Sequence, residues 1–213
     1  MPMSKQQFDL SLYLVTDRSL TLGRDIEWIV EEAIKGGVTM VQLREKDISA
    51  KEFIKLAIKL KTLLKPYKVP LIINDRLDVF LASDADGIHI GQSDMPYTIT
   101  RKLVGKDKII GLSVENIEQV QNANYLDVDY IGISPAFTTL TKTDIAEPFG
   151  LEGLRKVMEV TNHPAVAIGG INLTNAGSVI LTGVSGIAVV SAICSAPNPR
   201  EASYHLKNLI SYS

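Results

Sequence analysis

Short apolar runs alternate with amphipathic segments along the chain, and this alternation restricts the possible folds more than any other feature. A run that is hydrophobic at every position, such as 71–73, is typical of a strand buried on both faces of a parallel sheet. No tight hairpin signal such as Asn-Gly separates these runs, so crossover helices join parallel strands. We expect eight strands, at residues 10–17, 39–44, 69–75, 87–91, 108–113, 130–134, 165–170 and 186–191.

Helix start and stop signals occupy the intervals between these strands. Asp25 has the N-cap position of a helix at 26–35, which Gly36-Gly37 ends. Ser49 and Glu52 form a capping box for a helix that extends to residue 64. Further helices are expected at 76–83, from Pro96 to Gly105, after Asn116, and at 151–161, 174–183 and 199–210.

The number of strand–helix units and the length of the chain agree on one architecture. With 213 residues, 46% hydrophobic and 22% charged, the composition is that of an ordinary globular protein. We predict an α/β fold, a (β/α)8 TIM barrel in which residues 1–213 form a single catalytic domain. A doubly wound open sheet is the alternative, because periodicity alone does not show that a sheet closes.

Charge and cysteine content restrict the partners and the compartment. A net charge of −2 gives no electrostatic reason to expect nucleic acid or an anionic membrane as a partner. The most apolar stretch, 187–196, is too short to cross a bilayer, and residues 1–10 lack an apolar signal-peptide core. The single cysteine, Cys194, has no partner for an internal disulfide. We therefore expect a cytoplasmic protein that acts on small molecules, and the sequence leaves homo-oligomerisation open.

Acidic residues follow two neighbouring strands at the end where barrels carry their active sites. Asn74 and Asp75 end the third strand, and Asp94 lies just beyond the fourth. Two carboxylates at adjacent strand ends are able to share Mg²⁺ with water and a substrate phosphate. The competing interpretation is that both aspartates are ordinary turn and cap residues.

Basic residues follow the second strand on the same rim. Gln42, Arg44 and Lys46 alternate, so an extended backbone directs all three side chains the same way. Arg44 grips phosphate through its fork and Lys46 acts as a point charge, which predicts a diphosphate clamp. A solvated run of charges at 44–47 is the other interpretation.

A second phosphate site is expected where the last two strands end. Gly169-Gly170 and Val190-Ser191 follow the seventh and eighth strands, a common place for phosphate in barrels. A Gly-Gly pair is equally typical of a tight turn. The polar segment 138–150, with Thr139, Thr141 and Lys142, is either a lid over the barrel mouth or a surface loop.

Several residues and patterns point away from other chemistries. His89 lies inside the fourth strand and is expected to be a packed, hydrogen-bonded residue, and Cys194 to be a buried structural thiol. Trp28 is expected to pack in the core. There is no His/Cys cluster for zinc, no Gly-x-Ser-x-Gly motif and no dinucleotide fingerprint.

Seven blocks in consistent order cover almost the whole chain and together resemble thiamine phosphate synthase. The blocks are Tyr13-Leu-Val-Thr-Asp17, Val41-Gln-Leu-Arg-Glu-Lys46, Leu71-Ile-Ile-Asn-Asp-Arg76, Ala85-Asp-Gly-Ile-His-Ile-Gly-Gln-Ser-Asp94, Thr139-Leu-Thr-Lys-Thr-Asp144, Ala167-Ile-Gly-Gly-Ile171 and Val189-Val-Ser-Ala-Ile193. The resemblance implies a (β/α)8 barrel that joins hydroxymethylpyrimidine diphosphate to a thiazole phosphate, with release of diphosphate. The chain departs from the family pattern at Val114-Glu115-Asn116, after Ser113, and at Pro135-Ala136-Phe137.

The resemblance also implies roles for individual residues. Asp75 and Asp94 correspond to the Mg²⁺ ligands, and Thr139, Thr141, Gly170, Val190 and Ser191 to the thiazole phosphate site. The pyrimidine diphosphate is implied to contact Gln42, Arg44, Lys46, Asn74, Ser113 and Lys142. Of these, Arg44, Lys46, Ser113 and Lys142 are the predicted catalytic residues.

The hypothesis for the mechanism is loss of Mg-bound diphosphate to give a pyrimidine methyl cation, which the thiazole nitrogen then traps. No covalent nucleophile is needed, and none is evident in the sequence. Two alternatives remain: a thiazole tautomerase-type relative, and a phosphometabolite-binding barrel without turnover. Asn74-Asp75-Arg76, Asp94 and Thr139-x-Thr141-Lys142 argue against the tautomerase, which has no use for a diphosphate–metal site.

Overall fold

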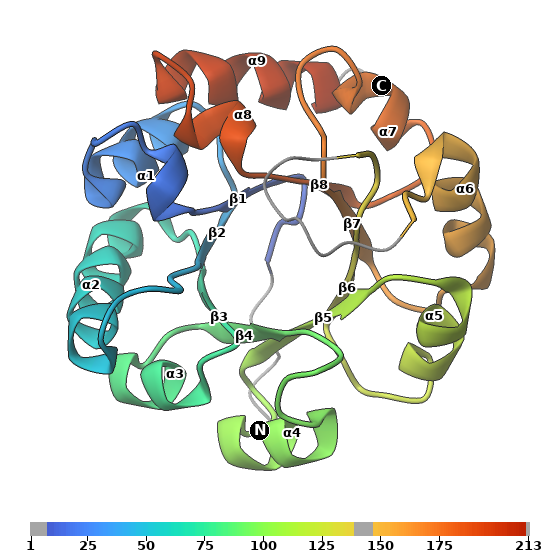
Figure 1. Ribbon diagram of the computed structural model, residues 1–213, viewed down its shortest axis with the longest axis horizontal. Helices are drawn as coiled ribbons and strands as arrows, with labels where there is room; N and C mark the ends of the chain where they lie inside the picture. Colours follow the sequence, from blue (N-terminus) through green and yellow to red (C-terminus); the bar gives the residue numbers. More distant parts are fainter. Residues whose placement is uncertain (1–7, 139–146, 212–213) are drawn as a thin grey trace.

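Eight parallel strands close into a barrel in the order of the sequence (Figure 1). The computed structural model describes residues 8–138 and 147–211. Tyr13 of the first strand pairs with Met40 of the second on one side and with Ala188 of the eighth on the other, which closes the sheet. The strands are β1 (Leu12–Val15), β2 (Met40–Leu43), β3 (Leu71–Asn74), β4 (Gly87–Ile90), β5 (Ile109–Val114), β6 (Tyr130–Ile133), β7 (Ala165–Ile168) and β8 (Gly186–Val189). The predicted (β/α)8 barrel is confirmed, and the open sheet is excluded.

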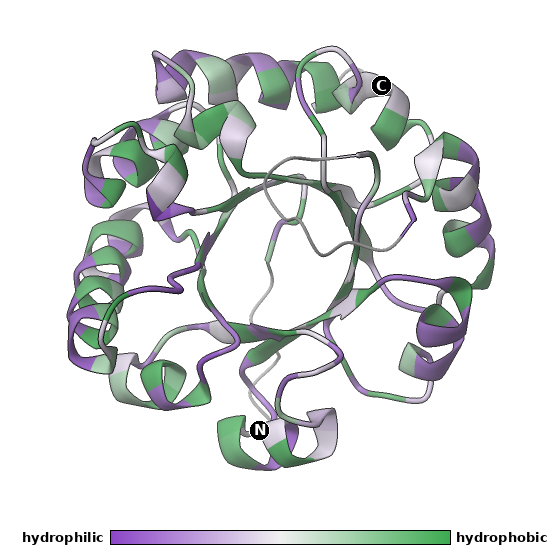
Figure 2. Cartoon of the chain, viewed as in Figure 1, coloured by the Kyte–Doolittle hydropathy of each residue, from purple (hydrophilic) through white to green (hydrophobic). Residues whose placement is uncertain are grey.

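Helices surround the strands and cover the outer face of the barrel (Figure 1). The α-helices are α1 (Ile26–Lys35), α2 (Ala50–Leu64), α3 (Leu77–Ser83), α4 (Tyr97–Val104), α5 (Ile117–Ala123), α6 (Gly150–Val160), α7 (Ala176–Ile180), α8 (Ser191–Cys194) and α9 (Pro199–Ser211). Two 3₁₀ turns, η1 (Arg18–Leu20) and η2 (Lys65–Tyr67), complete the described elements. In Figure 2 the strands are mostly hydrophobic, whereas the helices carry both hydrophobic and hydrophilic residues, as expected for helices with one solvated face.

Alternation along each strand separates two apolar layers. Leu12 and Leu14 of β1 point outward into the large cluster between sheet and helices. Tyr13 and Val15 point inward, into a smaller cluster that fills the barrel interior. Because successive strand residues face opposite sides, a strand that is apolar throughout supplies both layers. This explains why the predicted strands appear as continuous hydrophobic runs in the sequence.

The predicted N-cap positions hold at three helices, two of them with a side-chain capping hydrogen bond. Ser49 and Glu52 form the capping box of α2, and the Asn116 side chain accepts a hydrogen bond from the Gln119 amide at the start of α5. Asp25 has the N-cap position of α1, but its side chain makes no capping hydrogen bond. The short helix α8 was not expected, because four residues are too few to show a helical period.

Two predictions about packed residues have different outcomes. Cys194 is buried as a free thiol, as expected, and burial raises its pKa to about 11. Trp28 is 42% exposed, so the prediction that it packs in the core is wrong. It lies on the side of α1 opposite the buried Ile26, Val30 and Ala33, and the Arg24 guanidinium lies over its ring at 5.6 Å. Among the helices of the described residues, none is long and apolar enough to cross a membrane.

Candidate active site

A cavity of about 450 Å³ lies at the carboxyl ends of the strands and is lined by residues from all eight of them. This volume is in the range of small-molecule sites, and the position is the one that barrels use for catalysis. The cavity wall is chemically divided. Charged side chains gather at the ends of β2, β3 and β4, whereas the ends of β7 and β8 contribute glycines, aliphatic side chains and one hydroxyl.

Ten of the thirteen predicted site residues line this cavity. They are Gln42, Arg44, Lys46, Asn74, Asp75, Asp94, Ser113, Gly170, Val190 and Ser191. The other three, Thr139, Thr141 and Lys142, lie outside the described residues. The structure therefore brings together side chains from segments almost 150 residues apart.

The two predicted metal ligands lie side by side in the charged part of the wall. Asp75 follows β3 with a left-handed backbone (φ 61°), and its amide donates to the His89 carbonyl oxygen at 2.9 Å. Such a conformation is uncommon for a residue other than glycine and is often found at functional sites. One Asp94 oxygen accepts a hydrogen bond from the Gly91 amide at 2.7 Å. Burial, together with the nearby Asp75 carboxyl group, raises the pKa of Asp94, which is the behaviour of carboxylates that share one site.

The basic residues after β2 are held by acidic partners. Lys46 Nζ donates to Asp75 Oδ2 at 2.6 Å, and Arg44 Nη1 donates to Asp17 Oδ2 at 2.6 Å. Glu45, between them, points the other way and forms a forked ion pair with Arg18. The alternation predicted from the sequence therefore holds, with Arg44 and Lys46 on the cavity side. Sequence reasoning gave Asp17 no role, although a carboxylate directly after the first strand was a signal that could have been used.

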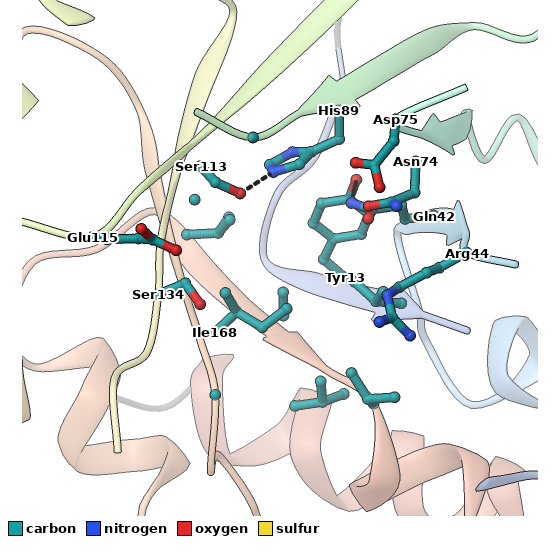
Figure 3. Close-up of a pocket in the computed structure, with 18 of the residues that line it drawn as sticks. Tyr13, Gln42, Arg44, Asn74, Asp75, His89, Ser113, Glu115, Ser134 and Ile168 are labelled. Atoms are coloured by element: carbon teal, nitrogen blue, oxygen red, sulfur yellow. Dashed lines mark hydrogen bonds between the residues drawn. The ribbon is translucent and has the colours of Figure 1, made fainter. Parts of the chain in front are cut away.

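A chain of buried hydrogen bonds crosses the floor of the cavity. Gln42 Nε2 donates to the Tyr13 hydroxyl at 2.9 Å, and the Tyr13 and Tyr130 hydroxyls are 2.8 Å apart. The Tyr130 hydroxyl lies 2.9 Å from His89 Nδ1. His89 Nε2 lies 2.8 Å from Ser113 Oγ, the contact marked by a dashed line in Figure 3. Burial lowers the pKa of His89 to about 4 and raises the pKa values of both tyrosines. These five residues, Gln42, Tyr13, Tyr130, His89 and Ser113, are called the relay below.

The relay confirms one prediction and shows what the sequence did not reveal. His89 is a buried, hydrogen-bonded strand residue, as expected, but it also lines the cavity. Tyr13 and Tyr130 were not singled out, because an inward-facing tyrosine in an apolar run cannot be told from a core residue. Only closure of the barrel brings them together, since they are 117 positions apart in the chain.

The uncharged part of the wall depends on backbone conformation. Gly169 and Gly170 both have positive φ, at 103° and 66°. A Cβ on Gly170 would lie 2.7 Å from the Thr138 carbonyl oxygen and 2.9 Å from Phe137 Cβ. Glycine is therefore required here both for its backbone conformation and for the close approach of residues 137–138. After β8 the chain passes through Val190 directly into the short helix α8.

The departure of the sequence after Ser113 has a clear structural description. Val114 is buried as the last residue of β5, and Asn116 caps α5. Glu115 lines the cavity, and its amide donates to Gln119 Oε1 at 2.7 Å. The substituted residues thus keep the strand–helix junction intact and add a carboxylate to the cavity wall near Ser113.

Comparison with known proteins gives one family. The profile described as thiamine monophosphate synthase matches residues 12–193. The thiamine-phosphate synthase of Leptospira biflexa serovar Patoc is 52% identical over 201 residues, which cover 92% of this chain and 96% of that protein. That of Vibrio campbellii is 52% identical over 199 residues, covering 93% and 97%.

A solved structure agrees with these relatives. Thiamine phosphate pyrophosphorylase from Pyrococcus furiosus superimposes with a TM-score of 0.88 at 39% identity, covering 95% of this chain and 96% of that one. The fold, the position of the cavity and the extent of the sequence match lead to the same conclusion. The chain belongs to the thiamine monophosphate synthase family.

Proposed function

We propose that the cavity joins hydroxymethylpyrimidine diphosphate to a thiazole phosphate, giving thiamine phosphate and diphosphate. Membership of the family makes the chain an enzyme of the transferase class with thiamine-phosphate synthase activity. The observation that carries the assignment of substrates to this cavity is its divided wall. A charged side with two carboxylates and two bases suits a diphosphate and its metal, whereas an uncharged side lined by glycines suits a phosphate monoester.

Asp75 and Asp94 fit a magnesium site. Their carboxyl groups are close enough for Asp75 to raise the pKa of Asp94, so a divalent cation between them would relieve their repulsion. The described residues contain no cluster of three or more His, Cys, Asp or Glu side chains that could hold a metal. Mg²⁺ is commonly held by one or two carboxylates, with water and substrate phosphate in the remaining positions, so two aspartates are sufficient for it. When bound, Mg²⁺ would neutralise charge on the diphosphate oxygens.

The protein's own side chains then act on the leaving diphosphate. Arg44 offers its guanidinium fork and Lys46 its ammonium group, and both stabilise negative charge that grows as the carbon–oxygen bond breaks. Asp17 and Asp75 hold these two groups in place before substrate arrives. The predicted third base, Lys142, lies outside the described residues and is proposed to serve the same leaving group.

Gln42, Asn74 and Ser113 are proposed to orient the pyrimidine. All three line the cavity, from β2, β3 and β5. Departure of diphosphate leaves a cation at the exocyclic methylene carbon, and the thiazole nitrogen donates its electron pair to form the new carbon–nitrogen bond. The protein has no covalent step to perform, so its contribution is alignment of two substrates and exclusion of water.

The thiazole phosphate is assigned to the uncharged side. Gly170, Val190 and Ser191 line the cavity where β7 and β8 end, next to a short helix of the kind that often accompanies phosphate sites in barrels. Thr139 and Thr141, which lie outside the described residues, are proposed to complete this site.

We further propose that residues 1–213 act as one catalytic domain in the cytoplasm. The buried free thiol of Cys194 supports a reducing compartment.

The decisive experiment measures diphosphate release with both substrates, with each substrate alone, and with Mg²⁺ removed by a chelator. The proposal expects release only when both substrates and Mg²⁺ are present. A thiazole tautomerase would rearrange the thiazole without releasing diphosphate, and a binding barrel would retain substrate without turnover.

Replacing Lys142 by Ala is expected to lower kcat more than it raises either KM; a change confined to KM would contradict its role with the leaving group.

A further inference from the structure

The relay has a direction, which follows from what each group can donate. The Gln42 amide nitrogen carries hydrogens and no free lone pair, so it donates to the Tyr13 hydroxyl. Tyr13 has one hydrogen, and its other hydrogen-bond partner in the described part of the chain is the Tyr130 hydroxyl, so it donates there. Tyr130 must then donate its own hydrogen to His89 Nδ1. Each hydrogen in this order has an acceptor.

The order determines the tautomer of His89 and the role of Ser113. An imidazole that accepts at Nδ1 carries its hydrogen on Nε2 when neutral, so His89 donates to Ser113 Oγ. The hydroxyl hydrogen of Ser113 is then left for an acceptor inside the cavity. At the other end, Gln42 turns Nε2 toward Tyr13 and keeps its carbonyl oxygen Oε1 for a donor in the cavity.

The direction of the relay can reverse only if all of its hydrogen bonds reverse together. This reversal requires the Gln42 amide to turn over so that Oε1 accepts from Tyr13, after which every hydrogen in the relay reverses and Ser113 donates to His89. A single reversal inside the relay would leave a buried hydroxyl hydrogen without an acceptor, which is costly. Among the described residues no buried side-chain polar atom lacks a partner. The amide of Gln42 and the hydroxyl of Ser113 are therefore coupled across the barrel.

The surrounding backbone leaves room for the relay, and the two tyrosines in its middle are buried. A Cβ on Gly111 would lie 2.2 Å from Tyr130 Cζ and 2.5 Å from His89 Nδ1, and one on Gly132 would lie 3.1 Å from His89 Cε1. Tyr13 and Tyr130 belong to the apolar cluster in the barrel interior and are 1% and 0% exposed. Because the two tyrosines are buried, the direction is set by the five side chains themselves.

We propose that Tyr13, Tyr130 and His89 are positioning residues that make the cavity present one acceptor, Gln42 Oε1, and one donor, the Ser113 hydroxyl, to the ring of the first substrate. The ring that fits carries a nitrogen acceptor and an exocyclic amino donor, as an aminopyrimidine does. A ring in which a carbonyl group replaces the amino group offers an acceptor where the relay presents another acceptor. The inference rests on the proposed function, since it takes the pyrimidine to lie between Gln42 and Ser113.

The direction of the relay is measurable without substrate. The chain has three histidines, so the double variant His163→Gln/His205→Gln leaves His89 as the single one. Nitrogen-15 NMR at neutral pH is expected to show a neutral imidazole protonated at Nε2. Protonation at Nδ1, an imidazolium, or an average of the two tautomers would overturn the proposal, whether or not the variant is active.

Substrate selectivity provides the second test. Tyr13→Phe removes the link between Gln42 and the rest of the relay while keeping the ring. We expect KM for the pyrimidine diphosphate to rise about tenfold, and KM for the thiazole phosphate to stay within about twofold. Preference for the aminopyrimidine over the corresponding pyrimidinone diphosphate is expected to fall about tenfold. Tyr204→Phe, on the exposed face of α9, is the matched control and should change neither value.

Two results in the selectivity test would contradict the relay. One is an unchanged preference between the two rings in Tyr13→Phe, and the other is an equal rise in both KM values, which indicates general damage to the barrel. If Tyr13→Phe does not fold, the tautomer of His89 in the histidine variant still decides the question. Failure of the proposed function is distinguishable, because it appears in the unmodified protein as absence of Mg²⁺-dependent diphosphate release.

Discussion

The two sides of the cavity wall, which we propose bind the phosphates of the two substrates, differ in construction. At the ends of β2, β3 and β4 the wall carries Arg44, Lys46, Asp75 and Asp94, and each base already forms an ion pair with an aspartate. At the ends of β7 and β8 the wall carries no charged side chain from the described residues and relies on the backbone around Gly169 and Gly170. Side chains that exchange partners are able to follow charge as it moves during a reaction, whereas a rigid backbone loop binds a group whose charge does not change. The comparison therefore predicts chemistry on the first side and binding on the second.

The largest effect is expected from Asp75→Asn, on the charged side. The change keeps the shape of the side chain but removes a proposed Mg²⁺ ligand and the partner of Lys46. We expect kcat to fall on the order of 10²–10³-fold, with a higher Mg²⁺ concentration needed for half-maximal rate. Steady-state diphosphate release across a Mg²⁺ series measures both quantities. The control is Asp78→Asn, an exposed carboxylate of α3 that pairs with Arg76 and does not line the cavity; it should act like the unmodified protein. An equal fall in kcat in Asp75→Asn and Asp78→Asn would contradict a catalytic role for the charged side.

A smaller effect is expected from Arg44→Lys, which keeps the charge and removes the fork. The pyrimidine diphosphate is expected to bind about tenfold less tightly, because a single ammonium group replaces a bidentate contact. Isothermal titration with Mg²⁺ and the pyrimidine diphosphate measures this change. Arg18→Lys is a matched control, since Arg18 also forms a forked ion pair, with Glu45, but lies outside the cavity lining. If Arg44→Lys instead weakens binding of the thiazole phosphate, the proposal that the diphosphate binds on the charged side is wrong.

Gly170→Ala tests the uncharged side. Its positive φ and the close Thr138 oxygen both oppose a Cβ, so the free energy of unfolding should fall by about 1–3 kcal/mol. KM for thiazole phosphate should rise about fivefold while kcat at saturation changes little. Gly183→Ala is the control, because its φ is also positive, at 95°, but the nearest atoms to an added Cβ are 3.9 Å away. It should lose stability from backbone strain and leave KM unchanged. A fall in kcat of Gly170→Ala larger than the rise in KM would assign chemistry to this side as well.

The smallest effect on turnover is expected from Cys194→Ala, in the helix that follows the uncharged side. Burial raises the pKa of the thiol from its ordinary value of 9.0 to about 11, so at pH 8 the folded protein holds much less thiolate than the unfolded chain. Alkylation at pH 8 should therefore be at least about a hundredfold slower in the folded protein than in urea, and kcat of the variant should stay within about twofold. Fast alkylation of Cys194 in the folded protein would contradict this prediction. Loss of enzyme activity on alkylation would also contradict it, because both results indicate a thiolate charge on this side of the cavity.

Local patterns were sufficient for most of the fold. The capping box of Ser49 and Glu52 and the Asn116 cap are formed by residues three positions apart, so they are readable without knowledge of the rest of the chain. Trp28 shows an error in applying such reasoning. With the period of an α-helix it lies on the side of α1 opposite Ile26, Val30 and Ala33, so the pattern itself predicts an exposed side chain.

The sequence by itself determined which residues reach the rim of the barrel. Polar residues that follow an apolar strand must lie at its carboxyl end, and Arg44, Lys46, Asp75 and Asp94 all line the cavity as this rule requires. It also determined that Arg44 and Lys46 share a side, because alternation in an extended backbone is a local property.

Only the tertiary structure decided which of these groups are partners. The pairing of Arg44 with Asp17 joins residues 27 positions apart, and the contact of Tyr13 with Tyr130 joins residues 117 positions apart. The first contact depends on the register of β1 against β2, and the second depends on closure of the sheet, which brings β1 and β6 to the same barrel interior. A hydrogen bond is lost when its atoms move apart by an ångström or less, whereas a hydrophobic pattern tolerates such shifts. For this reason the pattern was sufficient for the barrel and its rim, and the relay became visible only in three dimensions.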